Sequence, residues 1–195
     1  MDRKAVVEKR ALLLDDYFKV EEAYVSYEKF DGTMSAPVRR LDLVRGDAVA
    51  AILFDKERQR VILVSQFRYS ALSRGTGWTT EAVAGVIDPG ETPEQAVRRE
   101  ILEEAGYEVE KLERVFCFYP TPGITSERTI LYYAEPRGDG PVAKGGGLSH
   151  ENEDIRVVEL PLKDAFQQLD RGKIADAKTI IGLMWLRERV SSARS

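Results

Sequence analysis

The run from Gly85 to Tyr107 constrains the fold of this chain more than any other stretch. Residues 92–95 read Thr-Pro-Glu-Gln, which is a capping-box pattern with Thr92 as the N-cap and Gln95 as the third helical residue. Gly106 stands where the resulting helix would end in a left-handed residue. The run therefore predicts a single helix between Thr92 and Gly106, entered through a loop that contains glycine.

The two faces of this helix differ in character. An apolar stripe recurs at four-residue spacing: Val97, Ile101 and Ala105. Glu100, Glu103 and Glu104 share the opposite face, which we expect to be exposed. Like charges one turn apart destabilise a helix by about 0.2–0.5 kcal/mol, and a bound cation would offset that cost. Clustered carboxylates suit Mg²⁺ or Mn²⁺, although a solvated acidic face would show the same residues.

The full spacing is more specific than the acidic face alone. Seven residues fit the pattern G-x5-E-x7-R-E-U-x-E-E-x-G-U, where U is bulky and apolar: Gly85, Glu91, Arg99, Glu100, Glu103, Glu104 and Gly106. At ordinary residue usage, seven such matches have a chance probability on the order of 10⁻⁸ per window. The run resembles the Nudix box of the Nudix hydrolases. Tyr107 is a minor deviation from this motif, because an aliphatic residue is more usual at that position.

Further stretches resemble the branch of that family that contains ADP-ribose and GDP-mannose pyrophosphatases. Residues 38–46 resemble its basic strand, residues 121–127 its Ser-Pro-Gly turn, and residues 151–155 its acidic catalytic loop. Thr121 stands in place of the serine, and Ile124 replaces a common second glycine. These two changes leave the selectivity for the sugar open.

The resemblance implies a metal site. Its ligands would be Glu100 and Glu104, with Glu103 beside them, and also the carbonyl of Ala84 and the late Glu153. It further implies that Arg99 holds the glutamates in place and that Glu91 braces the junction of loop and helix. The cofactor would be Mg²⁺ or Mn²⁺, which neutralises a diphosphate and activates water.

The resemblance also places the general base on the acidic loop. We favour Glu151 as the base and Glu153 as the metal-linked residue, with the exchanged assignment left open. A glycine run, Gly145-Gly146-Gly147, precedes this loop and is expected to let it close over the metals.

Candidate substrate ligands lie elsewhere in the chain. Arg40 and Arg68 suit the phosphates, because a guanidinium matches phosphate oxygens bidentately. Tyr17 and Phe18 are candidates to stack on the base, although packing on a strand face would also explain them. Glu127 belongs to the turn that is expected to read the sugar.

Composition narrows the classes of partner, site and location that remain for this chain. A chain of 195 residues suits one domain with an appended element. Its net charge of −4 and lack of a long basic run do not favour nucleic acid as a partner. One cysteine and one histidine exclude a disulfide framework and a Cys/His zinc site, and the single His150 does not favour a catalytic triad. No apolar run reaches transmembrane length and no signal-peptide core is present, so we expect no membrane association and a cytoplasmic enzyme.

The expected fold is α/β. We expect a Nudix-fold α/β/α sandwich with a mixed sheet in residues 46–195, preceded by an antiparallel β extension in residues 1–45. Strands are expected at residues 5–14, 17–29, 37–45, 47–55, 60–67, 81–87, 112–119, 128–134 and 155–160. Besides the motif helix, helices are expected at residues 162–170 and 177–190.

The expected reaction is hydrolysis of the pyrophosphate of a nucleoside diphosphate sugar. ADP-ribose, giving AMP and ribose 5-phosphate, is the leading substrate, and GDP-mannose is the alternative. A domain that binds a nucleotide sugar without cleaving it is a further alternative, although it would not need the carboxylate cluster. The resemblance also implies a homodimer, in which the N-terminal β unit covers its unpaired edges and contacts the base of the substrate.

Overall fold

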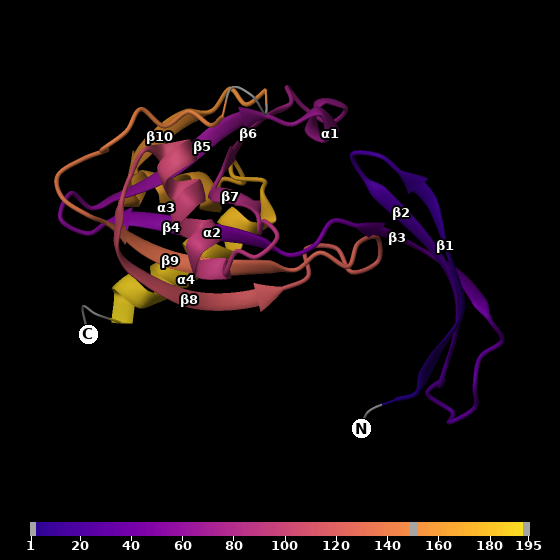
Figure 1. The fold of residues 1–195 in the computed structure, drawn as a ribbon. Coiled ribbons are helices and arrows are strands. Elements are labelled where there is room, and N and C mark those ends of the chain that lie inside the picture. The colour runs from indigo at the N-terminus through magenta and orange to yellow at the C-terminus, as the bar shows by residue number, and fades with distance from the viewer. Residues whose placement is uncertain (1–2, 149–151, 193–195) are drawn as a thin grey trace. The chain divides into compact units, whose positions relative to one another are not determined.

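The structure is a computed structural model that describes residues 3–148 and 152–192. The chain divides into two compact units. The first comprises Met1–Gly46 and Tyr119–Arg128, and the second comprises Asp47–Phe118 and Thr129–Ser195 (Figure 1).

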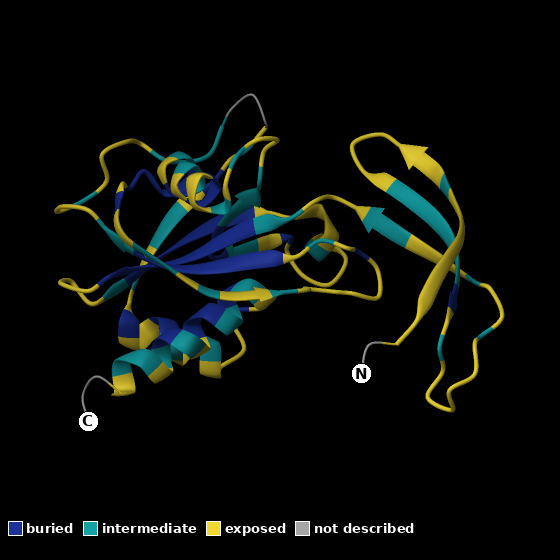
Figure 2. Cartoon of the chain, turned by 60° about the horizontal axis from the view of Figure 1, so that its bottom comes forward, coloured by how far each residue is buried: buried dark blue, intermediate teal, exposed yellow. Residues whose placement is uncertain are grey.

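The first unit is built on an antiparallel sheet with the order β1-β2-β3. Its strands are β1 (Ala5–Asp15), β2 (Lys19–Tyr27) and β3 (Val38–Val44). The expected second strand begins two residues late, so that Tyr17 and Phe18 lie in the turn before β2 rather than on a strand face. Nearly every residue of β1 is exposed, including Leu12, Leu13 and Leu14, as Figure 2 shows by colour. Within the first unit, this apolar sheet surface is therefore uncovered.

The second unit contains a mixed sheet with the order β10-β5-β4-β9-β8, in which β6 also pairs with β5 and β7 with β4. The pair β4–β9 is parallel, whereas the others are antiparallel. The strands are β4 (Ala48–Asp55), β5 (Arg60–Phe67), β6 (Trp78–Glu81), β7 (Val83–Val86), β8 (Val109–Phe118), β9 (Thr129–Pro136) and β10 (Arg156–Pro161). The runs in β4 and β5 are almost wholly apolar because both faces of these strands are covered.

Helices cover both faces of this sheet, which confirms the expected α/β/α sandwich (Figure 1). On one face, α2 (Pro93–Glu100) packs through Ala96 and Val97 against alternate residues of β4 and β5. On the other face, α3 (Leu162–Asp170) and α4 (Ala177–Ser192) pack against the intervening residues. None of the helices in the described ranges has the length and apolar character needed to cross a membrane.

The start of the motif helix follows the sequence pattern. The Thr92 hydroxyl accepts a hydrogen bond from the Gln95 N–H at 3.3 Å, and the Gln95 side chain accepts one from the Thr92 N–H at 2.8 Å. The capping box is therefore present. The end of the helix differs from a regular α-helix, because Ile101–Ala105 form a π-helical turn (η1) before the left-handed Gly106.

Two further local features were not expected. A short helix, α1 (Tyr69–Leu72), follows β5. The single strand expected at residues 81–87 is instead two strands, because the chain changes partner from β5 to β4 at Ala82. The N–H of Ala82 is bound by the Thr179 hydroxyl of α4, at 2.6 Å, rather than by a strand.

Candidate active site

Arg99 lies at the centre of the motif. Its guanidinium makes two hydrogen bonds to the Glu91 carboxylate, at 3.1 and 3.0 Å, and a third to the Val86 carbonyl at 3.2 Å. Nη1 also binds Glu100 Oε1 at 2.7 Å and Glu103 Oε2 at 3.0 Å. The hydrogen bonds from Arg99 lower the pKa of Glu91. Arg99 therefore joins the loop after β7 to the acidic helix.

The absence of a side chain at Gly85 leaves room for the Glu100 carboxylate. A Cβ on Gly85 would lie only 1.8 Å from Glu100 Oε1, so this position accepts no side chain without moving that carboxylate. Burial raises the pKa of Glu100 to about 7, against the charge and hydrogen bond of Arg99. The charges of Glu103 and Glu153 add to this rise. The positive charge of Arg99 therefore does not fully offset the cost of burying an ionised Glu100 carboxylate.

Glu104 is buried and not exposed as expected for its face of the helix, since only 2% of its surface is accessible. The reason is that η1 packs against β5, β7 and β10, so that this face of the helix is covered. Glu104 Oε2 accepts a hydrogen bond from the Ala84 N–H at 3.2 Å. Burial, followed by the charge of Glu100, raises the pKa of Glu104 to about 8, and Glu153 contributes to the same rise.

These residues fit a divalent cation by their chemistry. Glu100 is half-buried and Glu104 is buried, and the charge of Glu100 adds to the cost of ionising Glu104. A hard cation would offset the cost of burying both charges. Among residues 3–148 and 152–192, however, no three acidic, histidine or cysteine side chains already meet in the geometry of a metal site. The structure thus shows carboxylates that a metal would have to draw together, with Arg99 bonded to two of them.

The acidic loop reaches the same region. The Glu153 carboxylate accepts a hydrogen bond from the Leu148 N–H at 3.0 Å. Glu151 lies outside the described residues. The run Gly145–Gly147 does not stand free as the hinge that we expected: Gly146 and Gly147 donate their N–H groups to the carbonyls of Glu104 and Glu103, at 2.9 and 3.0 Å.

Arg68 takes part in a network that the sequence analysis missed. Its guanidinium binds both carboxylate oxygens of Glu81, at 3.0 and 2.9 Å. Lys178 of α4 binds Glu81 at 2.8 Å and Asp176 at 2.9 Å. Burial opposes ionisation of Glu81, but the hydrogen bond from Arg68 and the charge of Lys178 outweigh it and lower its pKa to about 2. The signal in the sequence was Glu81, a charged residue at the start of the otherwise apolar strand expected at residues 81–87.

The remaining candidates belong to the first unit. Arg40 lies on β3 and donates to the carbonyl of its neighbour Arg39 at 3.0 Å. Tyr17 is 85% exposed and contacts the edge of Phe18, with ring centroids 4.7 Å apart. Glu127 forms an ion pair with Arg45 at 3.5 Å. All of these contacts lie within the first unit.

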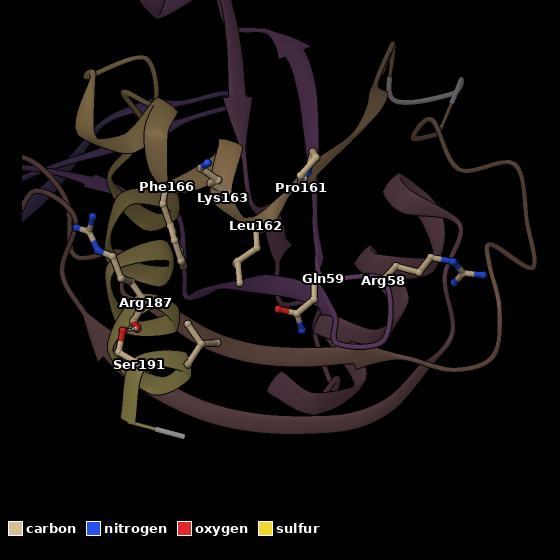
Figure 3. Close-up of a pocket in the computed structure, with 9 residues that line it drawn as sticks. Arg58, Gln59, Pro161, Leu162, Lys163, Phe166, Arg187 and Ser191 are labelled. Atoms are coloured by element: carbon tan, nitrogen blue, oxygen red, sulfur yellow. Dashed lines mark hydrogen bonds between the residues drawn. The ribbon is translucent and has the colours of Figure 1, made fainter. Parts of the chain in front are cut away.

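A surface pocket lies on the opposite side of the sheet from the acidic helix. It is lined by Arg58, Gln59, Pro161, Leu162, Lys163, Phe166, Arg187, Val190 and Ser191 (Figure 3). Two of its cations already have acidic partners, since Arg58 pairs with Asp55 and Arg187 with Asp170. No candidate site residue lines it, so this pocket is not the expected site.

Comparison with known proteins agrees with this geometry. The family model of the NUDIX domain matches residues 44–181. The chain is 39% identical over 179 residues to ADP-ribose pyrophosphatase of Escherichia coli strain K12, covering 91% of this chain and 85% of the relative. It is 34% identical over 183 residues to GDP-mannose pyrophosphatase of Cronobacter sakazakii, covering 93% and 94%.

A solved structure has the same fold. The crystal structure of an ADP compounds hydrolase superposes with a TM-score of 0.74 at 20% identity and covers 97% of this chain and 96% of its own. The family match spans most of the chain and contains the helix, the loop and the arginine described above. This protein therefore belongs to the Nudix family of hydrolases.

Proposed function

We propose that this protein hydrolyses the pyrophosphate of nucleoside diphosphate sugars in the presence of Mg²⁺, and that ADP-ribose, cleaved to AMP and ribose 5-phosphate, is its main substrate. One observation carries the reaction class: the Glu100 and Glu104 carboxylates lie half-buried and buried beside the Gly85 loop. The identity of 39% to an ADP-ribose pyrophosphatase supports the choice of substrate.

Glu100, Glu104 and Glu153 would hold the metal, with Glu103 and the Ala84 carbonyl beside them. When bound, Mg²⁺ or Mn²⁺ supplies positive charge to the diphosphate and acidifies a water molecule. Arg99 fixes Glu100 and Glu103 from one side, so that their carboxylates do not rotate freely. Such pre-ordered side chains lower the barrier because little reorganisation remains for the reaction itself.

The attack of water on one phosphorus breaks the bond to the bridging oxygen and leaves two phosphate monoesters. We propose that Glu151 is the general base that takes the proton of the attacking water, and that Glu153 binds the metal. Glu151→Gln should then lose turnover while KM is largely kept. If only Glu153→Gln behaves in this way, the two roles are exchanged, and if neither does, the base lies elsewhere.

Arg68 would bind a phosphate oxygen. Two of its N–H groups are used by Glu81, which leaves others for the substrate. Glu81 also pairs with Lys178, which in turn pairs with Asp176, so the charges of this group balance. Arg68 would therefore act through its remaining N–H groups.

GDP-mannose is the second candidate. GDP-mannose pyrophosphatases match almost the whole chain at 32–34% identity, as the proteins of Cronobacter sakazakii, Citrobacter koseri and Escherichia coli strain HS show. The phosphate and metal ligands do not read the sugar, so selectivity would come from residues 121–127, residues 136–149 and the N-terminal unit.

We further propose a cytoplasmic homodimer in which residues 1–45 form the interface and, through Arg40, Tyr17 and Phe18, contact the base of the substrate, with Glu127 near the sugar. The exposed apolar residues of β1 support this assignment, because a sheet surface of this kind is rarely left open to water.

The experiment is incubation with Mg²⁺ and a panel of nucleoside diphosphate sugars, followed by chromatography of the products. We expect kcat/KM for ADP-ribose to exceed that for GDP-mannose at least tenfold, which is about 1.4 kcal/mol of differential binding of the transition state. Chelation of the metal should abolish both reactions. A preference for GDP-mannose would reverse the substrate assignment. Tight binding of a nucleotide sugar without cleavage would instead indicate a sensor.

A further inference from the structure

The segment Gly145–Gly147 runs against the end of the acidic helix. The N–H of Gly146 donates to the Glu104 carbonyl at 2.9 Å, and the N–H of Gly147 donates to the Glu103 carbonyl at 3.0 Å. A helix leaves its last carbonyls without partners in the helix itself. Here a segment about forty residues later in the chain donates the missing hydrogen bonds, and the carbonyls that accept them belong to Glu103 and Glu104.

The other side of the same segment contacts Glu153 and Ile155. The Gly146 carbonyl accepts a hydrogen bond from the Ile155 N–H at 3.2 Å, and the Leu148 carbonyl accepts one from the Glu153 N–H at 3.3 Å. The Leu148 N–H donates to the Glu153 carboxylate itself at 3.0 Å. The segment thus lies between the helix end and Glu153, with hydrogen bonds to both.

The closeness of these contacts requires glycine. A Cβ on Gly145 would lie 2.8 Å from both the Ala105 carbonyl carbon and the Glu104 carbonyl oxygen, which are backbone atoms. A Cβ on Gly147 would lie 2.5 Å from Glu153 Oε2. Both residues also have positive φ, +64° and +78°. A side chain at either position would therefore separate the loop from the helix or push the Glu153 carboxylate away.

We propose that Gly145, Gly146 and Gly147 are positioning residues for the reaction, which hold Glu153 and Ile155 at a fixed place on the end of the metal-binding helix. Through them the backbone at Glu103 and Glu104 and the backbone at Glu153 keep one arrangement before any metal binds, so that a metal has only side chains to draw together. This inference rests on the proposed function, because it assigns those carboxylates to one metal site. The glycine run acts as a rigid joint and not as a hinge.

The contact itself can be tested by amide hydrogen exchange in the chelator-treated, full-length protein. Gly146 and Gly147 should exchange at least ~10²-fold more slowly than glycine in an unstructured peptide, because their N–H groups are bonded to the helix. Gly145→Ala should accelerate both. Exchange in the wild-type protein at the unstructured rate would overturn the proposal.

The consequence for the site can be tested by measuring the affinity for Mn²⁺ alone. The electron paramagnetic resonance signal of the free ion reports how much Mn²⁺ is unbound. Gly147→Ala should weaken Mn²⁺ binding by at least ~10-fold, the lower end of what loss of a residue that orients a metal ligand costs. The matched control is Gly138→Ala. It introduces the same left-handed strain, since φ is +69°, but its Cβ meets nothing within 4 Å. Its Mn²⁺ affinity should stay within twofold of wild type.

The outcomes separate this inference from the proposed function. Equal Mn²⁺ affinities for Gly147→Ala and Gly138→Ala would overturn the positioning role. If Gly145→Ala does not fold, Gly147→Ala still tests the role, because the nearest atom to its Cβ belongs to a side chain. If the variants change amide exchange and Mn²⁺ affinity as expected but the protein cleaves no nucleotide sugar, the positioning role of the glycine run stands and the substrate assignment is refuted.

Discussion

Replacement of Gly85 by alanine should inactivate the enzyme with little effect on its fold. The added Cβ would lie 1.8 Å from Glu100 Oε1 and 2.1 Å from Cδ, whereas an ordinary contact at Cβ begins at about 3.4 Å. The obstacle is the end of a flexible side chain, so the carboxylate will move and the backbone of β7 will stay. The perturbation is therefore a displacement of one carboxylate.

The magnitude follows from that displacement. Glu100 Oε1 must move by more than an ångström, which also breaks its hydrogen bond of 2.7 Å to Arg99. Loss of a charged hydrogen bond costs about 1.5–3 kcal/mol locally. A misplacement of about 1 Å in a catalytic constellation can cost about 10²-fold in rate. We expect kcat for ADP-ribose to fall at least ~10²-fold.

The assay uses the fact that alkaline phosphatase releases phosphate from the product monoesters but not from the intact diphosphate. The control is Gly75→Ala, whose Cβ would meet only the Ala71 carbonyl oxygen, at an ordinary 3.9 Å, and whose backbone is unstrained. Thermal unfolding of both variants should stay close to that of wild type. Equal activity of Gly85→Ala and Gly75→Ala would refute the placement of Glu100 at the reacting centre.

Local patterns predicted most of the fold. The capping box, the left-handed Gly106 and the exact span of α3 depend on neighbours in sequence, so residue type alone indicates them. The central strands were equally clear, because strands buried on both faces are continuous apolar runs. Arg99 hydrogen-bonds to Glu91 and Glu103, and the role that the resemblance implied for it, holding the glutamates in place, stays a prediction.

Features that depend on distant partners were not predicted. Lys178 and Glu81 are 97 residues apart, and no spacing rule joins them. The burial of Glu104 arises from packing of η1 against three strands, whereas the helical pattern alone placed it on an exposed face. The glycine run has the composition of a flexible loop, and only its contacts with the helix end distinguish a joint from a hinge.

Three further predictions concern the buried carboxylates and the assembly. Glu104→Gln should lower turnover at least ~10²-fold yet fold normally in the absence of metal, because burial raises the pKa of Glu104 to about 8 and a neutral amide resembles its protonated form; unfolding at room temperature would contradict this. Light scattering at micromolar concentration should give about twice the chain mass of 22.0 kDa, and deletion of residues 1–45 should abolish the dimer; a mass of 22.0 kDa for the intact protein would refute the interface. Glu81 should make stability depend on pH in acid. Its pKa is about 2 in the folded protein against 4.5 in the free side chain. Its contribution, about 3 kcal/mol, is therefore fully present above pH 4.5 and is lost as the pH falls towards 2. Urea denaturation should show wild type more stable than Glu81→Gln at pH 7, with a difference that shrinks between about pH 4.5 and pH 2. A difference that is constant across this range would show that Glu81 is not held ionised by Arg68 and Lys178.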